Sequence, residues 1–299
     1  PGWTGMDSGW MNEISLKFRI EFALLRLVAF LFGCMSLESA STLSGKLWRF
    51  VAPHLSRHQR AIRHLSAAFP DKSAQEIEMI TRAMWDCLGR TFAESLRLNE
   101  MFAQKRLDSS AIVPVIAPYV AQGKGMVVCG AHQGNWEIGT MGLMQEGVGP
   151  VGLYQRVKNP LVDDYVHALR APFYPEGLLA KAPDTAMKLM RLIKRGSTLA
   201  MLGDLRDRGG LPATFFGQTA YSTAFPAMLA RHLDVPLFVA EIVRHPDVRF
   251  TLTMQEIDVP RTDDKTADIA VATQRLQDAY EASIRKRPEQ WMWAHQRWN

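Results

Sequence analysis

The fold is decided by the stretch Gly125-Met126-Val127-Val128-Cys129-Gly130-Ala131-His132-Gln133-Gly134-Asn135-Trp136-Glu137. An apolar run of β-forming residues ends in small residues, a histidine follows, and a Gly-Asn pair opens a predicted helix. Such a pattern predicts a buried strand that presents His132 at its carboxyl end. The helix that carries Glu137 is expected to begin directly after this histidine.

His132 and Glu137 form a candidate general base. They are five residues apart, about 140° around a regular helix, so they do not share one helical face. They can meet only if His132 lies on the loop and Glu137 reaches back from the first helical turn, where the helix dipole stabilises a carboxylate. That carboxylate can fix one imidazole nitrogen and leave the other as a proton acceptor.

Other interpretations of this histidine stay open. A histidine after a strand is often a hydrogen-bonded structural residue. A zinc site is disfavoured because the His-Glu-x-x-His spacing of helical metal sites is absent. Cys129 could be an acylated nucleophile, but the alternation along this strand suits a buried structural thiol better.

The composition indicates a folded protein. At 299 residues, the chain is long enough for one large or two modest domains. Its 47% hydrophobic and 22% charged residues are not the composition of a disordered protein. Cys34, Cys87 and Cys129 are widely spaced in apolar surroundings. They are expected to be reduced thiols on the cytoplasmic side. The net charge of +5 favours an anionic partner.

The positive charge is concentrated between residues 39 and 70, where no acidic residue occurs. A solvated helix face is one interpretation. No recognisable nucleic-acid-binding motif is present, so nucleic acid is not the expected partner. An anionic membrane surface or an acidic carrier protein fits the neighbouring sequence better. The cationic residues are Lys46, Arg49, Arg57, Arg60 and Arg63, with His54, His58 and His64 among them.

Residues 20–37 are apolar but contain Glu21 and Arg26. A spanning helix needs about 20 mostly uncharged residues, and a central arginine costs ~2.5–3.5 kcal/mol on insertion scales. We expect a membrane-associated helix that lies in or dips into one leaflet. A single span and a buried core helix are the alternatives. Residues 1–5 are expected to be an unstructured leader.

The rest of the chain predicts helices followed by alternating strands and helices. Residues 44–107 are expected to be helical, with Ser73 and Glu76 as a capping box. The expected strands are 125–129, 151–154, 198–202, 237–243 and 250–257; the expected helices are 134–145, 161–170, 184–195, 224–232 and 266–286. This alternation predicts an α/β fold with a mainly parallel central sheet flanked by helices. We expect a helical membrane-associating region over 1–110 and an α/β domain over 111–299, with sites at the carboxyl ends of the strands.

Further candidates follow the other strands. Arg156 is either a stabiliser of negative charge or a surface arginine at a helix start, and Asn159 can cap the helix that Pro160 begins. The run Leu202–Gly210 is expected to be a loop that faces the cleft and orders itself through ion pairs, where arginines oppose a bound cation. Phe215 and Phe216 can line an apolar channel or pack in the core. Three tryptophans within 291–298 favour docking over a core or at a membrane interface.

Taken together, these motifs resemble the glycerolipid and lysophospholipid acyltransferase superfamily. More narrowly, the chain is similar to the bacterial lipid A biosynthesis acyltransferases and their mannoside-lipid acyltransferase relatives. The shared pieces are the His-Gln-Gly-Asn-Trp-Glu block at 132–137, Arg156 with Asn159-Pro160, Gly203-Asp204-Leu205-Arg206-Asp207, Phe215-Phe216-Gly217 leading to Thr223-Ala224-Phe225-Pro226-Ala227, and the closing run 288–298.

The resemblance implies an O-acyltransferase that moves a fatty acyl chain from acyl carrier protein or coenzyme A to a membrane lipid hydroxyl, with a lipid A precursor preferred. It implies no metal or cofactor and a location on the cytoplasmic face of the bacterial inner membrane, monotopic or through one N-terminal anchor. His132 would be the base and Glu137 its orienting partner, while Arg156 and backbone N–H groups near Gly134 would stabilise the oxyanion. The candidates for acceptor binding are Asn135, Asn159, Asp204 and Arg206, and those for the acyl channel are Trp136, Phe215 and Phe216.

Two rival functions stay open. A hydrolase would be expected to carry a Gly-x-Ser-x-Gly nucleophile elbow, which does not occur. A non-enzymatic membrane- or carrier-binding protein would depend on the cationic segment and not on His132.

Overall fold

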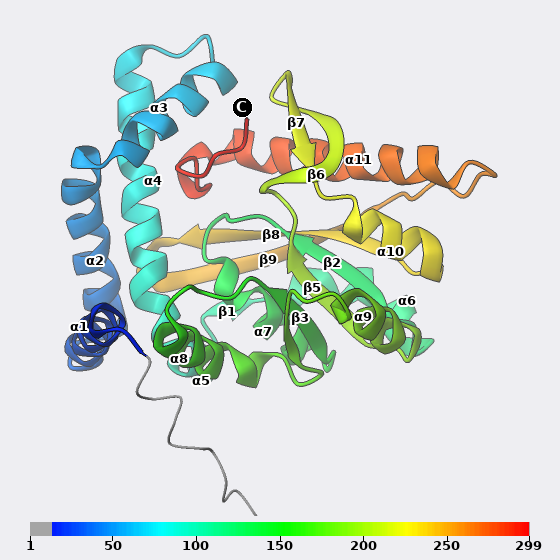
Figure 1. Ribbon diagram of the computed structural model, residues 1–299, viewed down its shortest axis with the longest axis horizontal. Coiled ribbons are helices and arrows are strands. Elements are labelled where there is room, and N and C mark those ends of the chain that lie inside the picture. Colours follow the sequence, from blue (N-terminus) through cyan, green and yellow to red (C-terminus); the bar gives the residue numbers. More distant parts are fainter. Residues whose placement is uncertain (1–13, 299) are drawn as a thin grey trace, which may run out of the picture.

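A computed structural model describes residues 14–298, so the leader expected for residues 1–5 lies outside the described residues. Its centre is a seven-stranded sheet in the order β1-β9-β8-β2-β5-β3-β4 (Figure 1). Every neighbouring pair is parallel except β8 and β9. The strands are β1 (Leu107–Asp108), β2 (Met126–Gly130), β3 (Pro150–Tyr154), β4 (Leu178–Ala180), β5 (Thr198–Leu202), β8 (Leu237–His245) and β9 (Arg249–Ile257). The predicted α/β class with a mainly parallel sheet is confirmed.

The helices surround this sheet. The α-helices are α1 (Leu16–Gly33), α2 (Leu37–Val51), α3 (Ser56–Ala68), α4 (Ala74–Ser95), α5 (Leu98–Ala103), α6 (Val113–Ala121), α7 (Gly139–Gln145), α8 (Pro160–Arg170), α9 (Thr185–Lys194), α10 (Phe225–Leu233) and α11 (Lys265–Lys286). Short 3-10 turns are η2 (Ala52–His54), η3 (Ser110–Ile112), η4 (Trp136–Ile138), η5 (Ala171–Phe173), η6 (Pro246–Val248) and η7 (Pro288–Gln290).

The five expected strands and four of the five helices expected after them form at the expected places. The helix expected over 134–145 begins only at Gly139, after the 3-10 turn η4. The capping box at the start of α4 is also present, because Ser73 accepts from the Glu76 backbone and Glu76 returns a bond to the Ser73 backbone. One prediction was wrong. The run expected to be a loop at 202–210 enters strand β6 (Arg206–Phe215), which forms an antiparallel hairpin with β7 (Gln218–Ser222). Regular pairing with β7 covers Leu211–Phe215, whereas only Arg206 of the glycine-rich start is paired and the register shifts between Arg206 and Leu211.

The core forms on both faces of the sheet because side chains alternate along each strand. Val127 and Cys129 of β2 face a cluster that includes residues of α9, α10 and α11. Met126 and Val128 face the opposite cluster, built with α5, α6 and α7. The tryptophans near the chain end belong to the first cluster: Trp291 is 1% exposed and Trp293 is 0% exposed. Of the two interpretations of this segment, docking over a core is therefore the one that holds.

Helices α1 to α4 stand along one side of the sheet (Figure 1). Helix α1 is capped by Ser15, whose side chain accepts from the Phe18 backbone, and it ends at Gly33. Within residues 14–298, no helix combines the length and the apolar character that crossing a bilayer requires. The membrane association of this region stays a prediction.

Candidate active site

His132 lies on the loop directly after β2, and Asp204 lies directly after the neighbouring strand β5. Because the carboxyl ends of adjacent parallel strands meet at one edge, residues 72 positions apart come together there. The Asp204 Oδ1 atom is 2.8 Å from His132 Nδ1. The other carboxylate oxygen accepts the backbone N–H of His132 at 2.8 Å. The carboxylate therefore holds both the ring and the backbone of the candidate base.

Asp204 is completely buried and also accepts a hydrogen bond from Trp291 Nε1 at 2.7 Å. Burial by itself raises the pKa of the Asp204 carboxyl, but the charge of His132 and the hydrogen bonds from His132 and Trp291 lower it further than burial raises it. The net pKa lies below the ordinary value for aspartate. An ionised carboxylate accepts hydrogen bonds only, so the His132 proton sits on Nδ1. The ring atom Nε2 is then left as the proton acceptor.

Glu137 has other partners. Its carboxylate accepts from Arg170 Nε at 2.6 Å and from Arg170 Nη2, and Trp136 Nε1 donates to it at 3.0 Å. No hydrogen bond joins Glu137 to His132 among the contacts of residues 14–298. The expected pairing is thereby corrected: Asp204 takes the place beside the imidazole. Glu137 lies within the 3-10 turn η4, and Arg170 in the last turn of α8 binds it.

Arg170 is a site residue that the sequence analysis missed. Burial lowers the pKa of its guanidinium, but the charge and hydrogen bonds of Glu137 raise it by more, so the pair is ionic. Both residues line the same cavity as His132. The only signal for Arg170 was its position near the end of a predicted helix that starts at the sheet rim.

Gly134 shapes the loop through its backbone. Its φ is +60°, and a Cβ atom at this position would lie 2.3 Å from the Ile242 carbonyl oxygen, so a side chain is excluded. Its N–H donates to the Gln290 carbonyl at 2.9 Å, and its own carbonyl accepts from Thr91 at 2.8 Å. The N–H expected to stabilise an oxyanion is therefore occupied by the protein in this structure.

The two asparagine candidates are framework residues in the structure. Asn135 is 0% exposed; its amide donates to Glu94 at 2.8 Å and its oxygen accepts from the Glu137 backbone at 3.2 Å. Asn159 is 4% exposed and caps α8 through Leu161, while its amide donates to the Phe18 carbonyl of α1. Neither side chain is presented to an acceptor.

Of the remaining candidates, some line the cavity beside His132 and others do not. Arg156 is exposed and is not among the residues that line the cavity, whereas Arg206 lines it. Phe215 and Phe216 are buried in the cluster with Trp291 and do not line the cavity. Trp136 does line it, and its ring centroid is 5.1 Å from that of His132.

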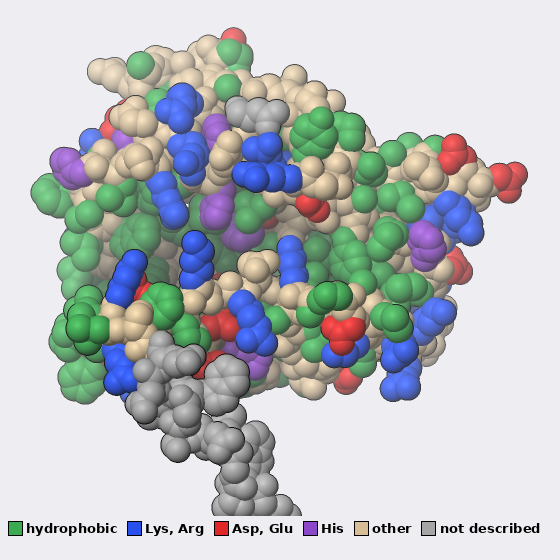
Figure 2. Space-filling view, viewed as in Figure 1, with side chains coloured by type: hydrophobic (Ala, Val, Ile, Leu, Met, Phe, Trp, Pro, Cys, Tyr) green, Lys and Arg blue, Asp and Glu red, His purple; other side chains and the backbone are tan. Residues whose placement is uncertain are grey.

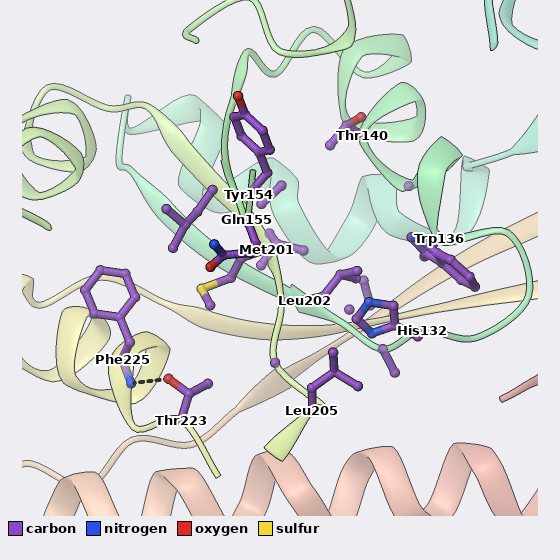
Figure 3. Close-up of a pocket in the computed structure, with 18 of the residues that line it drawn as sticks. His132, Trp136, Thr140, Tyr154, Gln155, Met201, Leu202, Leu205, Thr223 and Phe225 are labelled. Atoms are coloured by element: carbon purple, nitrogen blue, oxygen red, sulfur yellow. Dashed lines mark hydrogen bonds between the residues drawn. The ribbon is translucent and has the colours of Figure 1, made fainter. Parts of the chain in front are cut away.

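An apolar cavity of about 710 Å³ opens beside His132. In Figure 3, His132 and Trp136 lie at one end of the drawn residues and Thr223 and Phe225 at the other. Its apolar lining includes Val128, Leu143, Leu153, Leu189, Met201, Leu202, Leu205 and Phe225. Its cationic lining consists of Arg170, Lys181, Arg206 and Arg208. The same space thus combines an apolar wall with positive charge.

Two alternatives lose support here. Burial raises the pKa of the Cys129 thiol to about 12, so this thiol is not an available thiolate nucleophile. Across the part of the chain that the structure describes, no three His, Cys, Asp or Glu side chains gather in a way that could hold a metal ion.

A second histidine lies beside the first. The ring centroids of His132 and His295 are 5.9 Å apart. Burial and the charge of His132 lower the pKa of His295 to about 4, with smaller contributions from Arg57 and Arg60 and an opposing one from Asp204. His295 is therefore neutral near pH 7. It belongs to the closing tryptophan-rich run, and its contact with His132 was not predicted from the sequence.

The fold and the site define an α/β protein that places a carboxylate-paired histidine in the lining of an apolar cavity, an arrangement suited to acyl transfer. The chain belongs to the bacterial lipid A biosynthesis acyltransferase family, whose model matches residues 15–299. It is similar to the phosphatidylinositol mannoside acyltransferase of Mycolicibacterium smegmatis, with 24% identity over 247 residues that cover 79% of this chain and 78% of that protein. The protein is thus an acyltransferase.

Proposed function

We propose that the protein transfers a fatty acyl group from an acyl carrier protein or coenzyme A thioester to a hydroxyl group of a membrane lipid, with a lipid A precursor as the first candidate acceptor. The observation that carries this proposal is that His132, paired with Asp204, lines the apolar cavity. The name of the mycobacterial relative supports a second candidate, a glycolipid acceptor of the phosphatidylinositol mannoside type.

In the proposed reaction, His132 Nε2 removes the proton of the acceptor hydroxyl while Asp204 holds Nδ1–H. The resulting alkoxide attacks the thioester carbonyl, and a C–O bond forms. The tetrahedral intermediate collapses, the C–S bond breaks, and the leaving thiolate takes the proton back from His132. Base catalysis of this kind contributes about 10²–10⁴-fold. Positioning and stabilisation of the oxyanion must provide the remainder.

In this scheme Glu137 does not contact His132 and acts through its neighbours. It fixes Arg170 and Trp136, which both line the cavity. Arg170 and Arg206 supply positive charge for the oxyanion or for a substrate phosphate. Neither a metal nor a dissociable cofactor takes part in the proposed chemistry.

We also propose that α1 and α2 dock on the cytoplasmic face of an inner membrane. Large apolar side chains are exposed along both helices, with Leu16 72%, Phe30 67% and Phe50 73% exposed. Apolar side chains gather at the edge of the molecule where α1 and α2 lie in Figure 1 (Figure 2). The cations of the 39–70 segment suit the anionic headgroups at such a surface.

The test is reconstitution. Purified protein is mixed with acyl-carrier-protein or coenzyme A thioester and vesicles that contain the lipid acceptor, and the products are identified by mass spectrometry. We expect acylated lipid with wild-type protein and none with His132→Ala. Free fatty acid as the main product, formed equally without acceptor, would instead establish a hydrolase.

A further inference from the structure

A second buried polar centre contacts the loop between His132 and Glu137 but does not line the cavity. Glu94 of α4 is 0% exposed. Its carboxylate accepts from Arg244 Nη1 at 2.5 Å and Nη2 at 2.7 Å, from Ser41 of α2 at 2.7 Å, and from Asn135 at 2.8 Å. One carboxylate therefore joins α2, α4, β8 and the loop between His132 and Glu137.

The partner arginine holds the same loop from its other side. The Arg244 Nη2 atom donates to Thr91 at 2.9 Å, and Thr91 donates to the Gly134 carbonyl at 2.8 Å. The backbone N–H and carbonyl of Arg244 pair with the Gln290 side chain at 2.9 and 3.0 Å, while the Gln290 carbonyl accepts the Gly134 N–H at 2.9 Å. Gly134 and Asn135 are thus fixed by groups that all connect to this ion pair.

The pair is ionic and has no place in the proposed reaction. Burial lowers the pKa of the Arg244 guanidinium, but the charge of Glu94 raises it to a value well above normal. Neither residue lines the cavity. A buried ion pair stabilises a fold little more than an apolar pair of the same volume would, and it is often less stabilising. Its observed contacts instead fix the geometry of one loop.

We infer that Glu94 is a positioning residue that sets the His132–Glu137 loop and ties it to α2, the helix proposed to meet the membrane. The inference rests on the proposed function. Through Asn135, whose oxygen accepts the Glu137 backbone N–H, the position of Glu94 determines where the loop begins its 3-10 turn. A loop displaced by ~1 Å can lose about 10²-fold in rate without losing substrate binding.

The test replaces Glu94 by Gln and uses Asp268→Asn as its matched control. Asp268 is also buried (2% exposed) and pairs with Arg231 at 2.6 Å, but this pair joins α10 to α11. We expect both variants to lose thermal stability. Per folded molecule, we expect Glu94→Gln to lower kcat about 10–100-fold with KM within about twofold, while Asp268→Asn keeps the wild-type kcat.

Hydrogen exchange reports on the loop without any measurement of activity, so it tests the inference independently of the proposed function. Hydrogen exchange of peptides that cover residues 132–137 should accelerate in Glu94→Gln and not in Asp268→Asn. Unchanged exchange of this loop, or a wild-type kcat in folded Glu94→Gln, would overturn the inference. If wild-type protein transfers no acyl group but the exchange effect is seen, the proposed function fails and the structural link stands.

If Glu94→Gln does not fold, Asn135→Ala provides the second test because it leaves the ion pair intact. It deletes the contact with Glu94 and the one with the Glu137 backbone. We expect the same loss in kcat and the same faster exchange of the loop. A folded Asn135→Ala protein with wild-type kcat would contradict the positioning role.

Discussion

Replacing Asp204 by Asn should remove the catalytic base while leaving the fold intact. Two donors are fixed at Oδ2, the His132 backbone N–H at 2.8 Å and Trp291 Nε1 at 2.7 Å. The amide oxygen of an asparagine must occupy that position, because an NH₂ group there would face two donors. The NH₂ group then occupies the position of Oδ1, opposite His132 Nδ1.

An amide NH₂ donates only, so Nδ1 of His132 must become an acceptor and its proton must move to Nε2. The nitrogen that faces the acceptor hydroxyl then has no free lone pair. The general-base contribution of about 10²–10⁴-fold is lost; the same substitution in the serine protease triad lowers kcat about 10⁴-fold for this reason. We therefore expect kcat to fall by about 10³–10⁴-fold. Because every hydrogen bond of the site keeps a partner, stability should change by only about 1 kcal/mol.

The assay is acyl transfer to vesicle-borne lipid, measured at saturating donor, together with thermal unfolding of the same preparation. Asp268→Asn is the control, since it makes the same change at another buried carboxylate. A folded Asp204→Asn protein that keeps more than about a tenth of the wild-type kcat would refute the tautomer argument. Glu137 would then have to be reconsidered as the orienting group.

Three further predictions follow from the site and the surface. Glu137→Gln leaves the partly buried Arg170 without its counter-charge, so we expect about 1–3 kcal/mol of lost stability in chemical denaturation and a slower transfer reaction. Unchanged values of both would show that the pair is not needed. The folded-state pKa of Asp204 is lowered, so its carboxylate stabilises the fold at pH values above its unfolded-state pKa of about 3.9, and this contribution disappears as the pH falls through the lower folded-state pKa. Acid unfolding curves should therefore be steeper for wild type than for Asp204→Asn. Equal slopes would contradict the lowered pKa. Phe30→Asp places a charge on the most apolar part of α1. It should weaken flotation of the protein with anionic vesicles while leaving its thermal stability unchanged. Flotation equal to that of wild type would remove α1 from the proposed membrane surface.

The sequence was informative where a local pattern decides the structure. The alternation along β2, the small residues that end it and the histidine that follows predicted the position of His132 correctly. The partner of this histidine could not be predicted in the same way. Glu137 is near in sequence, but Asp204 is near in space because β2 and β5 are neighbours, and strand order is a tertiary property that no local spacing encodes.

The hairpin was missed for a related reason. The segment that starts β6 reads Arg206-Asp207-Arg208-Gly209-Gly210, which has the composition of a turn. Only Arg206 of this segment pairs with β7, and the regular pairing of the hairpin begins at Leu211 after a shift in register. Arg170 and Glu94 were not recognised as neighbours of the site, because each is a charged residue within a helix pattern. Their burial depends on how α8 and α4 pack against the loop.

The closing tryptophan-rich segment both packs in the core and contacts the candidate site. Trp291 is buried in the core, where hydrophobic burial alone would explain it. Its indole N–H nevertheless donates to Asp204, and the next residue, Met292, donates its backbone N–H to the His132 carbonyl at 3.1 Å. Gln133 and Trp291 also form an isolated antiparallel β-bridge. Since Trp291 holds the Asp204 carboxylate and Met292 holds the His132 backbone, the end of the chain directly supports the proposed base.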